Sequence, residues 1–255
     1  MKFGIPFLVL SVGQMCNLKC KNCANFAPYA TKEMRRYSLK SIITDFEDLF
    51  SVIGRIDRLQ IQGGEPLTYT DLPKLTGYLS ACEEIGSIEI ATNGTITPRD
   101  EWWHNFSINN IKIRVSNYPQ NRNNIELFVA KAQAYRVDVR LYDFASRESV
   151  WFDCGGLDTP RDNDDRVVSE RFDKCAFKGC LTFENGDLHR CSRAPNAHKL
   201  QGFDMPPPTD FVRVRDNKKL HDDLFAYLAY PRFETACRYC NGTYNTKKIL
   251  AAEQL

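Results

Sequence analysis

Hydrophobic positions in the first 145 residues repeat with two different periods. A continuous apolar run at 7–12 is typical of a strand buried on both faces, and further strands are predicted at 58–62, 87–91, 111–116 and 137–142. Between these strands, apolar side chains recur at helical spacing over 39–53, 72–83, 98–106 and 124–134. Ser38 and Asp71 stand where side chains cap the first two helices. Strands that alternate with helices in this way predict a parallel sheet with right-handed crossovers.

The remainder of the chain has a different pattern. Two short predicted strands flank Asn185-Gly186, a pair that favours a type I′ hairpin turn. A helix is predicted at 220–229, before Pro231. We therefore expect an α/β unit followed by a small α+β unit with a β-hairpin, at 1–150 and 151–255.

The composition excludes several classes of partner. The chain has 34 Lys and Arg against 32 Asp and Glu, a net charge of +2, so it lacks the basic surplus that binds nucleic acid. Its mean hydropathy is −0.42, and no apolar run approaches the roughly 20 residues of a membrane helix. The N-terminus is similar to a signal peptide, but Pro6 interrupts its apolar stretch and no small-x-small cleavage site follows. These features predict a cytoplasmic protein without a nucleic-acid or membrane partner.

Ten cysteines are the unusual feature of the composition. A disulfide framework is typical of secreted chains too small to build a core, and 255 residues are ample for one. In a cytoplasmic protein, clustered cysteines more often bind metal. Three of them form a C-x3-C-x2-C motif, here named the first cysteine group: Cys16, Cys20 and Cys23. Five more form the second cysteine group: Cys175, Cys180, Cys191, Cys237 and Cys240.

The first cysteine group lies on the loop after the first predicted strand. Ligand sites of parallel α/β sheets form at the carboxyl ends of the strands, so these thiols stand where a ligand binds. Three thiolates leave one position of a four-iron cluster open, as catalytic metal sites do. The alternative is a zinc site completed by a distant residue, since the nearest histidine in the sequence is His104.

Two motifs in the same order resemble the radical S-adenosylmethionine (SAM) enzymes. The three-cysteine motif follows the first predicted strand, and Gly63-Gly64-Glu65-Pro66 follows the second. Thr92-Asn93-Gly94 and Ser116-Asn117 end the third and fourth strands and agree with the resemblance, which covers about residues 5–145. By itself the Gly-Gly-Glu-Pro motif indicates only a turn. The resemblance implies a partial (β/α) barrel with five to six parallel strands.

The resemblance also implies a cofactor site. The first cysteine group holds a [4Fe–4S] cluster whose open iron is chelated by SAM, and the glycine motif binds the methionine ammonium. An electron from a flavodoxin- or ferredoxin-type donor cleaves SAM to a 5′-deoxyadenosyl radical, which abstracts hydrogen from the substrate. The family usually has an aromatic residue before the third cysteine, but this chain has Asn22, so Phe26 is the candidate for contact with adenine. The residues predicted to bind SAM are Gly63, Gly64, Glu65, Asn93, Ser116, Asn22 and Phe26.

The second cysteine group resembles the twitch domain, a truncated SPASM domain. Cys175 and Cys191 enclose Gly186 in a C-x10-G-x4-C arrangement, and the C-x2-C pair follows near the C-terminus. The resemblance implies an auxiliary [4Fe–4S] cluster with four ligands, and five cysteines are present for the four places. We favour Cys175, Cys191, Cys237 and Cys240 as the ligands, with Cys180 as the substitute for Cys175. A four-cysteine zinc site is the alternative that this spacing permits.

The two remaining cysteines have separate interpretations. Cys82 has apolar neighbours on a predicted helix and is interpreted as a buried small hydrophobic residue. Cys154 follows the last core strand, close to the expected mouth of the active site, and is either a catalytic hydrogen-atom donor or a plain loop cysteine. Four residues near the same mouth are candidates for substrate contact: Arg140, Tyr142, Asp143 and Trp151.

The resemblance favours one reaction over two others. An auxiliary cluster without an open iron is suited to electron transfer, so a substrate radical loses a further electron and a proton to give a ketone. Twitch-domain dehydrogenases of aminoglycoside biosynthesis carry out this oxidation, which predicts a small polar substrate such as a sugar or cyclitol. One alternative is epimerisation or cross-linking of a ribosomally made peptide. The other is an iron–sulfur or zinc scaffold without enzymatic activity.

Overall fold

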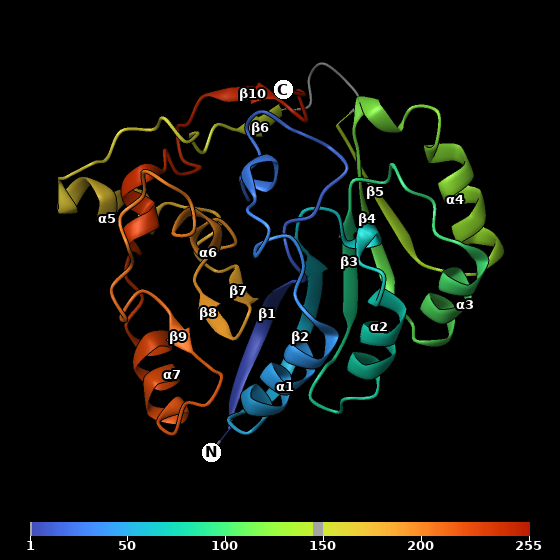
Figure 1. The fold of residues 1–255 in the computed structure, drawn as a ribbon, viewed down its shortest axis with the longest axis horizontal. Coiled ribbons are helices and arrows are strands. Elements are labelled where there is room, and N and C mark those ends of the chain that lie inside the picture. Colours follow the sequence, from blue (N-terminus) through green and yellow to red (C-terminus); the bar gives the residue numbers. More distant parts are fainter. Residues whose placement is uncertain (1, 145–149) are drawn as a thin grey trace.

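The computed structural model describes residues 2–144 and 150–255, which are built around an eight-stranded sheet (Figure 1). The strand order is β5-β4-β3-β2-β1-β7-β8-β9. Six neighbouring strands are parallel: β5 (Val139–Asp143), β4 (Lys112–Asn117), β3 (Ile88–Thr92), β2 (Ile53–Gln62), β1 (Phe3–Ser11) and β7 (Leu181–Glu184). Two antiparallel strands complete the sheet, β8 (Asp187–His189) and β9 (Val212–Arg213).

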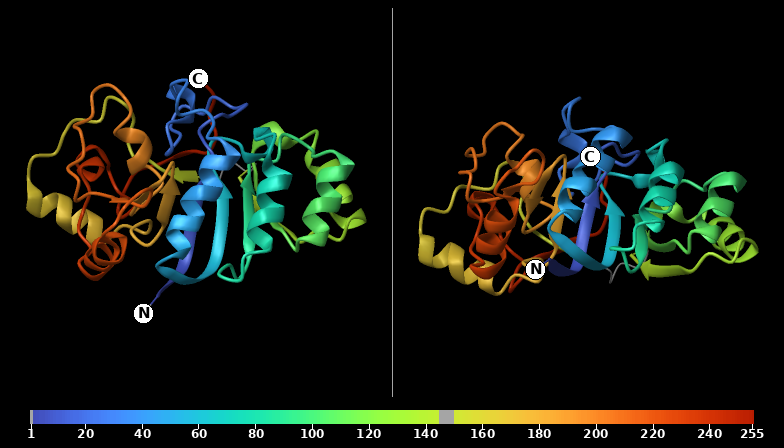
Figure 2. Two further views of the ribbon diagram at one scale, coloured as in Figure 1. Left: turned by 60° about the horizontal axis from the view of Figure 1, so that its bottom comes forward. Right: turned by 90° about the horizontal axis from the view of Figure 1, so that it is seen from below.

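Four helices cover one face of the parallel part of the sheet (Figures 1 and 2). They are α1 (Leu39–Phe50), α2 (Leu72–Ser80), α3 (Asp100–Ile108) and α4 (Ile125–Ala134). Three more helices belong to the C-terminal part, α5 (Asp165–Asp173), α6 (Ala194–Ala197) and α7 (Leu220–Ala229). Short 3-10 turns are found at Ala27–Tyr29, Pro66–Thr68, Pro119–Asn121 and Thr235–Tyr239.

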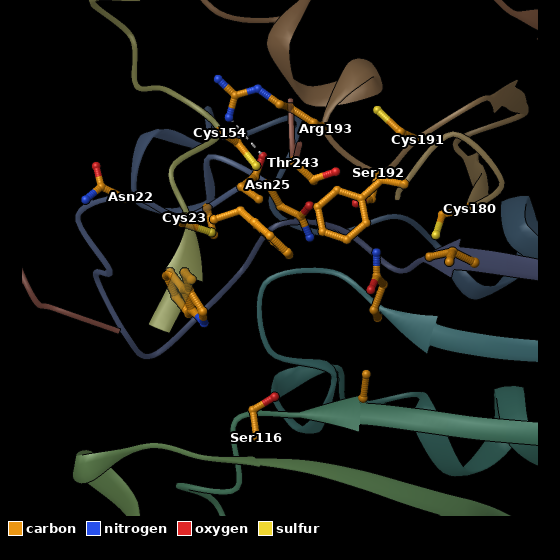
Figure 3. A pocket seen from close by; sticks show the side chains of 18 of the residues that line it. Asn22, Cys23, Asn25, Ser116, Cys154, Cys180, Cys191, Ser192, Arg193 and Thr243 are labelled. Atoms are coloured by element: carbon orange, nitrogen blue, oxygen red, sulfur yellow. Dashed lines mark hydrogen bonds between the residues drawn. The ribbon is translucent and has the colours of Figure 1, made fainter. Parts of the chain in front are cut away.

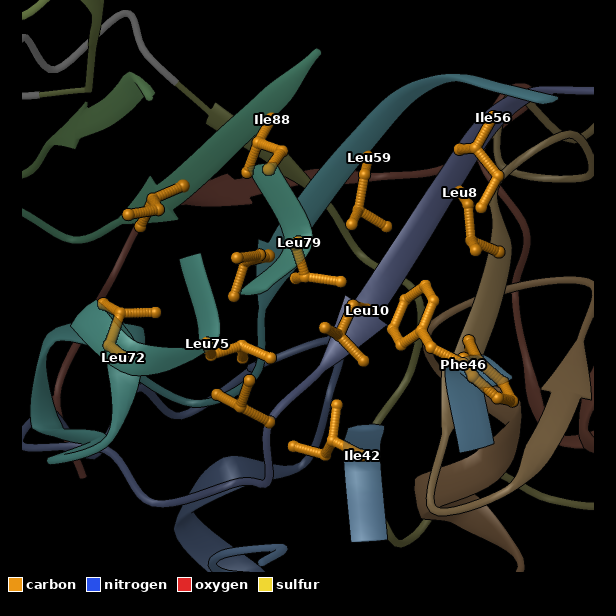
Figure 4. Close-up of a cluster of buried hydrophobic side chains, with 14 of the residues drawn as sticks. Leu8, Leu10, Ile42, Phe46, Ile56, Leu59, Leu72, Leu75, Leu79 and Ile88 are labelled. Carbon is orange, nitrogen blue, oxygen red and sulfur yellow. The ribbon is translucent and has the colours of Figure 1, made fainter. Parts of the chain in front are cut away.

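Alternate residues of each strand point to opposite faces of the sheet, and one face is apolar. Leu8 and Leu10 of β1 and Leu59 of β2 are fully or almost fully buried against Phe46 of α1 and Leu75 of α2 (Figure 4). Helix α1 begins at the predicted residue because the Ser38 side chain accepts a hydrogen bond from the Ser41 amide. The hydrophobic core therefore lies between the sheet and helices α1 to α4.

The opposite face of the same strands is more polar, although Phe7, Val9 and Ala91 also belong to it. It carries side chains from the positions between the core residues, and the strand registers align them across the sheet: Ser11, Arg58, Gln60, Gln62, Glu89, Arg114, Ser116, Tyr142 and Thr182. A polar face on a sheet whose other face forms the core is available for ligands rather than for packing.

The parallel sheet, its five N-terminal strands, helices α1 to α4, the hairpin and α7 agree with the sequence predictions. Asn185 and Gly186 both have positive φ, as a type I′ turn requires. Strand β1 begins at Phe3 and includes Pro6, which is tolerated because β7 pairs with β1 only from Leu8 onwards.

The structure also contains features that the sequence did not predict. Asp71 does not cap α2 with its side chain, which instead forms an ion pair with Lys74. Helix α5 was not predicted, nor was the small second sheet in which β6 (Val150–Phe152) pairs with β10 (Lys248–Leu250). Strand β7 of the second predicted unit pairs with β1 of the first, so both units contribute to one sheet, and the division at residue 150 stays a prediction.

Within the described residues, no helix combines the length and the hydrophobicity that crossing a membrane requires.

Candidate active site

A cavity of about 640 Å³ lies on the polar face of the sheet. Its walls come from the carboxyl ends of the parallel strands, from the loop after β1 and from segments of the C-terminal part. Nine of the ten cysteines line it, so the two cysteine groups face one space. Figure 3 shows Cys23 and Cys154 at one part of this cavity and Cys180 and Cys191 at another, with Ser116 on a strand opposite them. Cys82 is the exception and packs partly buried against the core, as its interpretation predicts.

The first cysteine group has the donor chemistry of a metal-cofactor site. None of its thiols is in a disulfide, and all three line the cavity. Burial raises the pKa of the Cys16 thiol to about 12 and also raises the pKa of Cys20 and Cys23. Buried thiolates are therefore unfavourable here unless a metal cation compensates their charge, and an iron–sulfur cluster supplies that charge.

Gly63 and Gly64 pack directly against the backbone that precedes Cys16. The Gly64 amide donates to the Gly13 carbonyl at 3.0 Å, and the Glu65 amide donates to the Met15 carbonyl at 2.8 Å. A Cβ atom at position 63 or 64 would overlap these carbonyl groups. The two glycines are explained by close backbone approach, so the motif is more than a turn.

Glu65 connects the second and third strand ends rather than facing the cavity. Its carboxylate is 2% exposed and accepts from the Thr92 hydroxyl at 2.6 Å, the Asn93 amide at 2.7 Å and the Leu67 amide at 3.0 Å. Burial raises the pKa of Glu65, and the three donated hydrogen bonds oppose that shift. Glu65 is not among the residues that line the cavity, so its contact with the SAM ammonium stays a prediction.

Gly63, Gly64, Asn22, Asn93 and Ser116 line the cavity where the resemblance expects SAM. The Asn93 side chain donates to Asn17 at 3.0 Å, which ties the end of β3 to the first cysteine loop. Their individual roles stay predictions. Of the four candidates for substrate contact, Tyr142 and Trp151 line the cavity, whereas Arg140 and Asp143 are not among its lining residues.

The predicted contact of Phe26 with adenine disagrees with the structure. The Phe26 ring is 1% exposed and packs between the Arg193 guanidinium, whose carbon is 4.1 Å from the ring centre, and Phe203 at 5.5 Å. It is not among the lining residues, because these tertiary contacts turn it toward the C-terminal part.

Three of the aromatic side chains that line the cavity contact one another, and sequence reasoning missed their association. The Tyr118 ring lies 5.5 Å from Phe144 and 5.6 Å from Trp151, measured between ring centres. Tyr118 directly follows the Ser116-Asn117 strand end, which is the one local signal that could have identified it. Trp151 reaches this position from β6, so only the fold brings the three rings together.

Cys154 lies within the second cysteine group rather than apart from it. Its thiol is 7% exposed and hydrogen-bonds with Cys240, which lowers the pKa of Cys240 to about 6 and, together with burial, raises that of Cys154. The charges of Cys175 and Cys240 also act on Cys154. Six cysteines are thus available for an auxiliary site, and the role of Cys154 as a hydrogen-atom donor stays a prediction. In the described parts of the chain, no three His, Cys, Asp or Glu side chains are arranged to hold a metal ion.

Arg193 joins the two cysteine groups. Arg193 is buried, with 5% of its surface exposed. Its guanidinium donates to the carbonyls of Ala24 at 3.5 Å, Gly155 at 3.1 Å and Tyr239 at 3.4 Å. Ala24 follows the last cysteine of the first group, while Gly155 and Tyr239 adjoin Cys154 and Cys240. The Arg193 charge lowers the pKa values of thiols in both groups, against the larger effect of burial on Cys23.

A parallel α/β sheet that holds three unpaired cysteines and a close-packed Gly-Gly motif at its strand ends has the donor chemistry expected of a metal-cofactor site. Residues 10–110 match the model of the Radical SAM superfamily. This match implies a [4Fe–4S] cluster and SAM as the cofactors of this part of the chain. The loop of the first cysteine group fits that cluster in its donor chemistry.

Curated relatives match only part of this chain. GTP 3',8-cyclase of Stenotrophomonas maltophilia (strain R551-3) is 26% identical over 120 residues, which cover 47% of this chain and 36% of the relative. GTP 3',8-cyclase of Xanthomonas axonopodis pv. citri (strain 306) is 35% identical over 104 residues, or 38% of this chain and 30% of the relative. The match thus spans about a third of the length of these relatives.

Solved structures extend the similarity of the fold to the whole chain. The crystal structure of BtrN in complex with AdoMet and 2-DOIA has a TM-score of 0.63 at 17% identity and covers 100% of both chains. A structure of BtrN in an open conformation has a TM-score of 0.55 at 14% identity, again over the full length of both. At these identities the likeness is one of fold.

Proposed function

We propose that this protein is a radical SAM dehydrogenase that oxidises an alcohol carbon of a small polar substrate, such as a sugar or cyclitol. The observation that carries the proposal is the single cavity that both cysteine groups face. Its volume of about 640 Å³ is in the usual range of small-molecule sites, and the sheet contributes polar side chains to its lining, such as Gln60, Gln62 and Ser116. BtrN supports the proposal because its fold covers the whole chain and its structure contains AdoMet together with a second small molecule, 2-DOIA.

Within this proposal the two parts of the chain have different tasks. Residues 1–150 form the radical SAM core, and residues 151–255 form a twitch-type domain whose cysteines hold an auxiliary [4Fe–4S] cluster. The clusters and SAM supply one-electron chemistry that removes hydrogen from an unactivated carbon, with a flavodoxin- or ferredoxin-type protein as electron donor. A second, fully ligated cluster at the same cavity accepts the second electron that the substrate carbon loses.

The chain's own residues bind and orient the reactants. Gly63 and Gly64 bring backbone groups close to the first cysteine loop, where SAM is expected. Tyr118 and Trp151 give the cavity an apolar wall, which suits a flat ring such as adenine. Because β6 carries Trp151 and pairs with β10, the C-terminal strand helps to exclude water from the site.

Metal analysis tests the cluster content. Anaerobically reconstituted protein is expected to hold about eight irons and eight sulfides, since each four-iron cluster contains four of each. Replacing all three cysteines of the first group with Ala should leave about half of the iron and abolish SAM cleavage. A wild-type protein that holds four irons together with zinc would contradict the auxiliary cluster.

Product analysis tests the reaction. With a sugar or cyclitol substrate, the reduced enzyme should form a ketone and 5′-deoxyadenosine in equal amounts. Cys237→Ala and Cys240→Ala should stop ketone formation while SAM cleavage continues, because they remove ligands of the auxiliary cluster alone. Cys82→Ala is the matched control, since this thiol packs against the core outside the cavity. Ketone formation at the wild-type rate by both ligand variants would refute the dehydrogenase proposal.

A further inference from the structure

Residues 251–255, here named the tail segment, pair with the loop of the first cysteine group. Cys20 and Gln254 face each other in an antiparallel bridge. Next to this bridge, the Lys21 amide donates to the Glu253 carbonyl at 2.7 Å. Figure 1 shows this end of the chain beside the loop that follows β1. The tail segment therefore meets the middle cysteine of the C-x3-C-x2-C motif directly.

The tail segment is also fixed from its other side. Ala252 is fully buried, and its carbonyl accepts from the Gln120 side chain at 3.0 Å. Gln120 lies in the 3-10 turn that follows β4. Strand β10, which leads into the tail segment, is paired with β6. The position of the tail segment against the cysteine loop is thus part of the fold.

Two backbone groups orient the side chain of Gln254. Its Oε1 atom accepts from the Lys19 amide at 2.8 Å, and its Nε2 atom donates to the Ala252 carbonyl at 2.7 Å. An amide donor at Lys19 requires an oxygen opposite it, so the nitrogen must take the other position. That nitrogen also donates to the Cys20 Sγ atom at 3.4 Å.

This contact leaves the cavity side of the Cys20 sulfur free for a metal centre. Cys20 lines the cavity, whereas Gln254 is not among the lining residues. The other two thiols accept from amides of their own loop: Cys16 from Leu18 at 3.4 Å, and Cys23 from the amides that follow it. N–H donors therefore reach all three sulfurs, and one donor of Cys20 comes from a residue 234 positions later in the chain.

We propose that the Gln254 side chain raises the reduction potential of the [4Fe–4S] cluster at the first cysteine group. A sulfur that ligates iron carries negative charge, and one-electron reduction of the cluster adds to that charge. An N–H donor stabilises the more negative form, so the hydrogen bond to Cys20 makes the cluster easier to reduce. The cluster follows from the family match of residues 10–110, and the inference does not depend on the dehydrogenase proposal.

A redox titration of anaerobically reconstituted protein, followed by electron paramagnetic resonance, tests this proposal. The signal that changes when SAM is added belongs to the first cluster, because SAM binds its open iron. Gln254→Glu keeps an oxygen for the Lys19 amide but replaces the donor to Cys20 with an acceptor, and Gln254→Met removes both polar atoms at similar length. Each variant should lower the potential of this signal by about 59 mV, a tenfold change in a one-electron equilibrium.

Leu255→Glu is the matched control because it adds the same charge one residue further along the tail segment. The Leu255 side chain is 63% exposed, and its amide donates to the Lys19 carbonyl at 2.9 Å, a contact that the substitution keeps. Since water and salt screen an exposed charge, the potential of this variant should stay close to that of the wild type.

Three results would overturn the proposal. The first is a wild-type potential in both Gln254 variants, and the second is a shift in Leu255→Glu as large as that in Gln254→Glu. The third is loss of the first cluster from Gln254→Met, seen as a fall in iron content that Leu255→Glu does not show, because Gln254 would then act in assembly. The titration needs no substrate, so a failure of the proposed function, such as absence of ketone, is recognised separately.

Discussion

Replacing Glu65 with Gln tests whether this carboxylate organises the site or contacts SAM. In the structure, one carboxylate oxygen accepts from Leu67 and Thr92, and the other accepts from the Asn93 amide. Gln has nearly the same shape, so it can keep the first oxygen. Its amide nitrogen then replaces the second oxygen and faces the Asn93 N–H, where two donors meet without an acceptor.

The cost of this change follows from the lost hydrogen bond. A hydrogen bond to a buried charged acceptor contributes about 1.5–3 kcal/mol, so Glu65→Gln should lower the free energy of unfolding by about that amount. Glu65→Ala removes all three acceptor contacts, which gives a loss of about 4.5 kcal/mol at the lower end of the same range. SAM affinity should fall as a consequence, because Gly63-Gly64 and Asn93 lose their common support.

The assay is urea unfolding of anaerobically purified protein, followed by circular dichroism, together with calorimetric titration of SAM. Glu47→Gln is the matched control because Glu47 is exposed on α1, and its unfolding midpoint should equal that of the wild type. If Glu65→Gln unfolds at the wild-type midpoint yet binds SAM weakly, the carboxylate acts by direct contact, and the reasoning from its hydrogen bonds is refuted.

Three further predictions concern the same site. Gly64→Ala should destabilise the protein by about 1–3 kcal/mol and prevent SAM binding, because the added Cβ meets the Met15 backbone. Gly77→Ala is the control, since open space surrounds that position, and it should have neither effect. Equal melting temperatures for the two variants would contradict this prediction. Arg193→Gln should lower the free energy of unfolding by about 2 kcal/mol, measured by thermal unfolding, because buried carbonyls lose their donor. Unchanged stability would show that Arg193 does not hold the segments of the two cysteine groups together. Cys154→Ala should still form ketone, and the product should carry no solvent deuterium. A stalled variant, with deuterium in the wild-type product, would indicate that this thiol donates hydrogen.

The sequence alone determined the local elements and the first cysteine group. Helix α1 and strand β1 were predictable because their patterns depend on residues a few positions apart, as the Ser38 cap does. The C-x3-C-x2-C spacing places three thiols on one loop whatever surrounds it, and the glycine pair marks a close approach that any larger residue would prevent. Local chemistry of this kind can be predicted before the fold is known.

Only the tertiary structure decided which distant residues share the cavity. Cys154 meets Cys240 and Trp151 meets Tyr118 through contacts between segments far apart in the chain, which no local pattern encodes. Phe26 was predicted to contact adenine because it lies near the cysteine motif, yet burial against Arg193 and Phe203 turned it elsewhere. Strand β7 joined the main sheet because β1 had a free edge that could satisfy its backbone hydrogen bonds, and this long-range pairing brings the second cysteine group to the first.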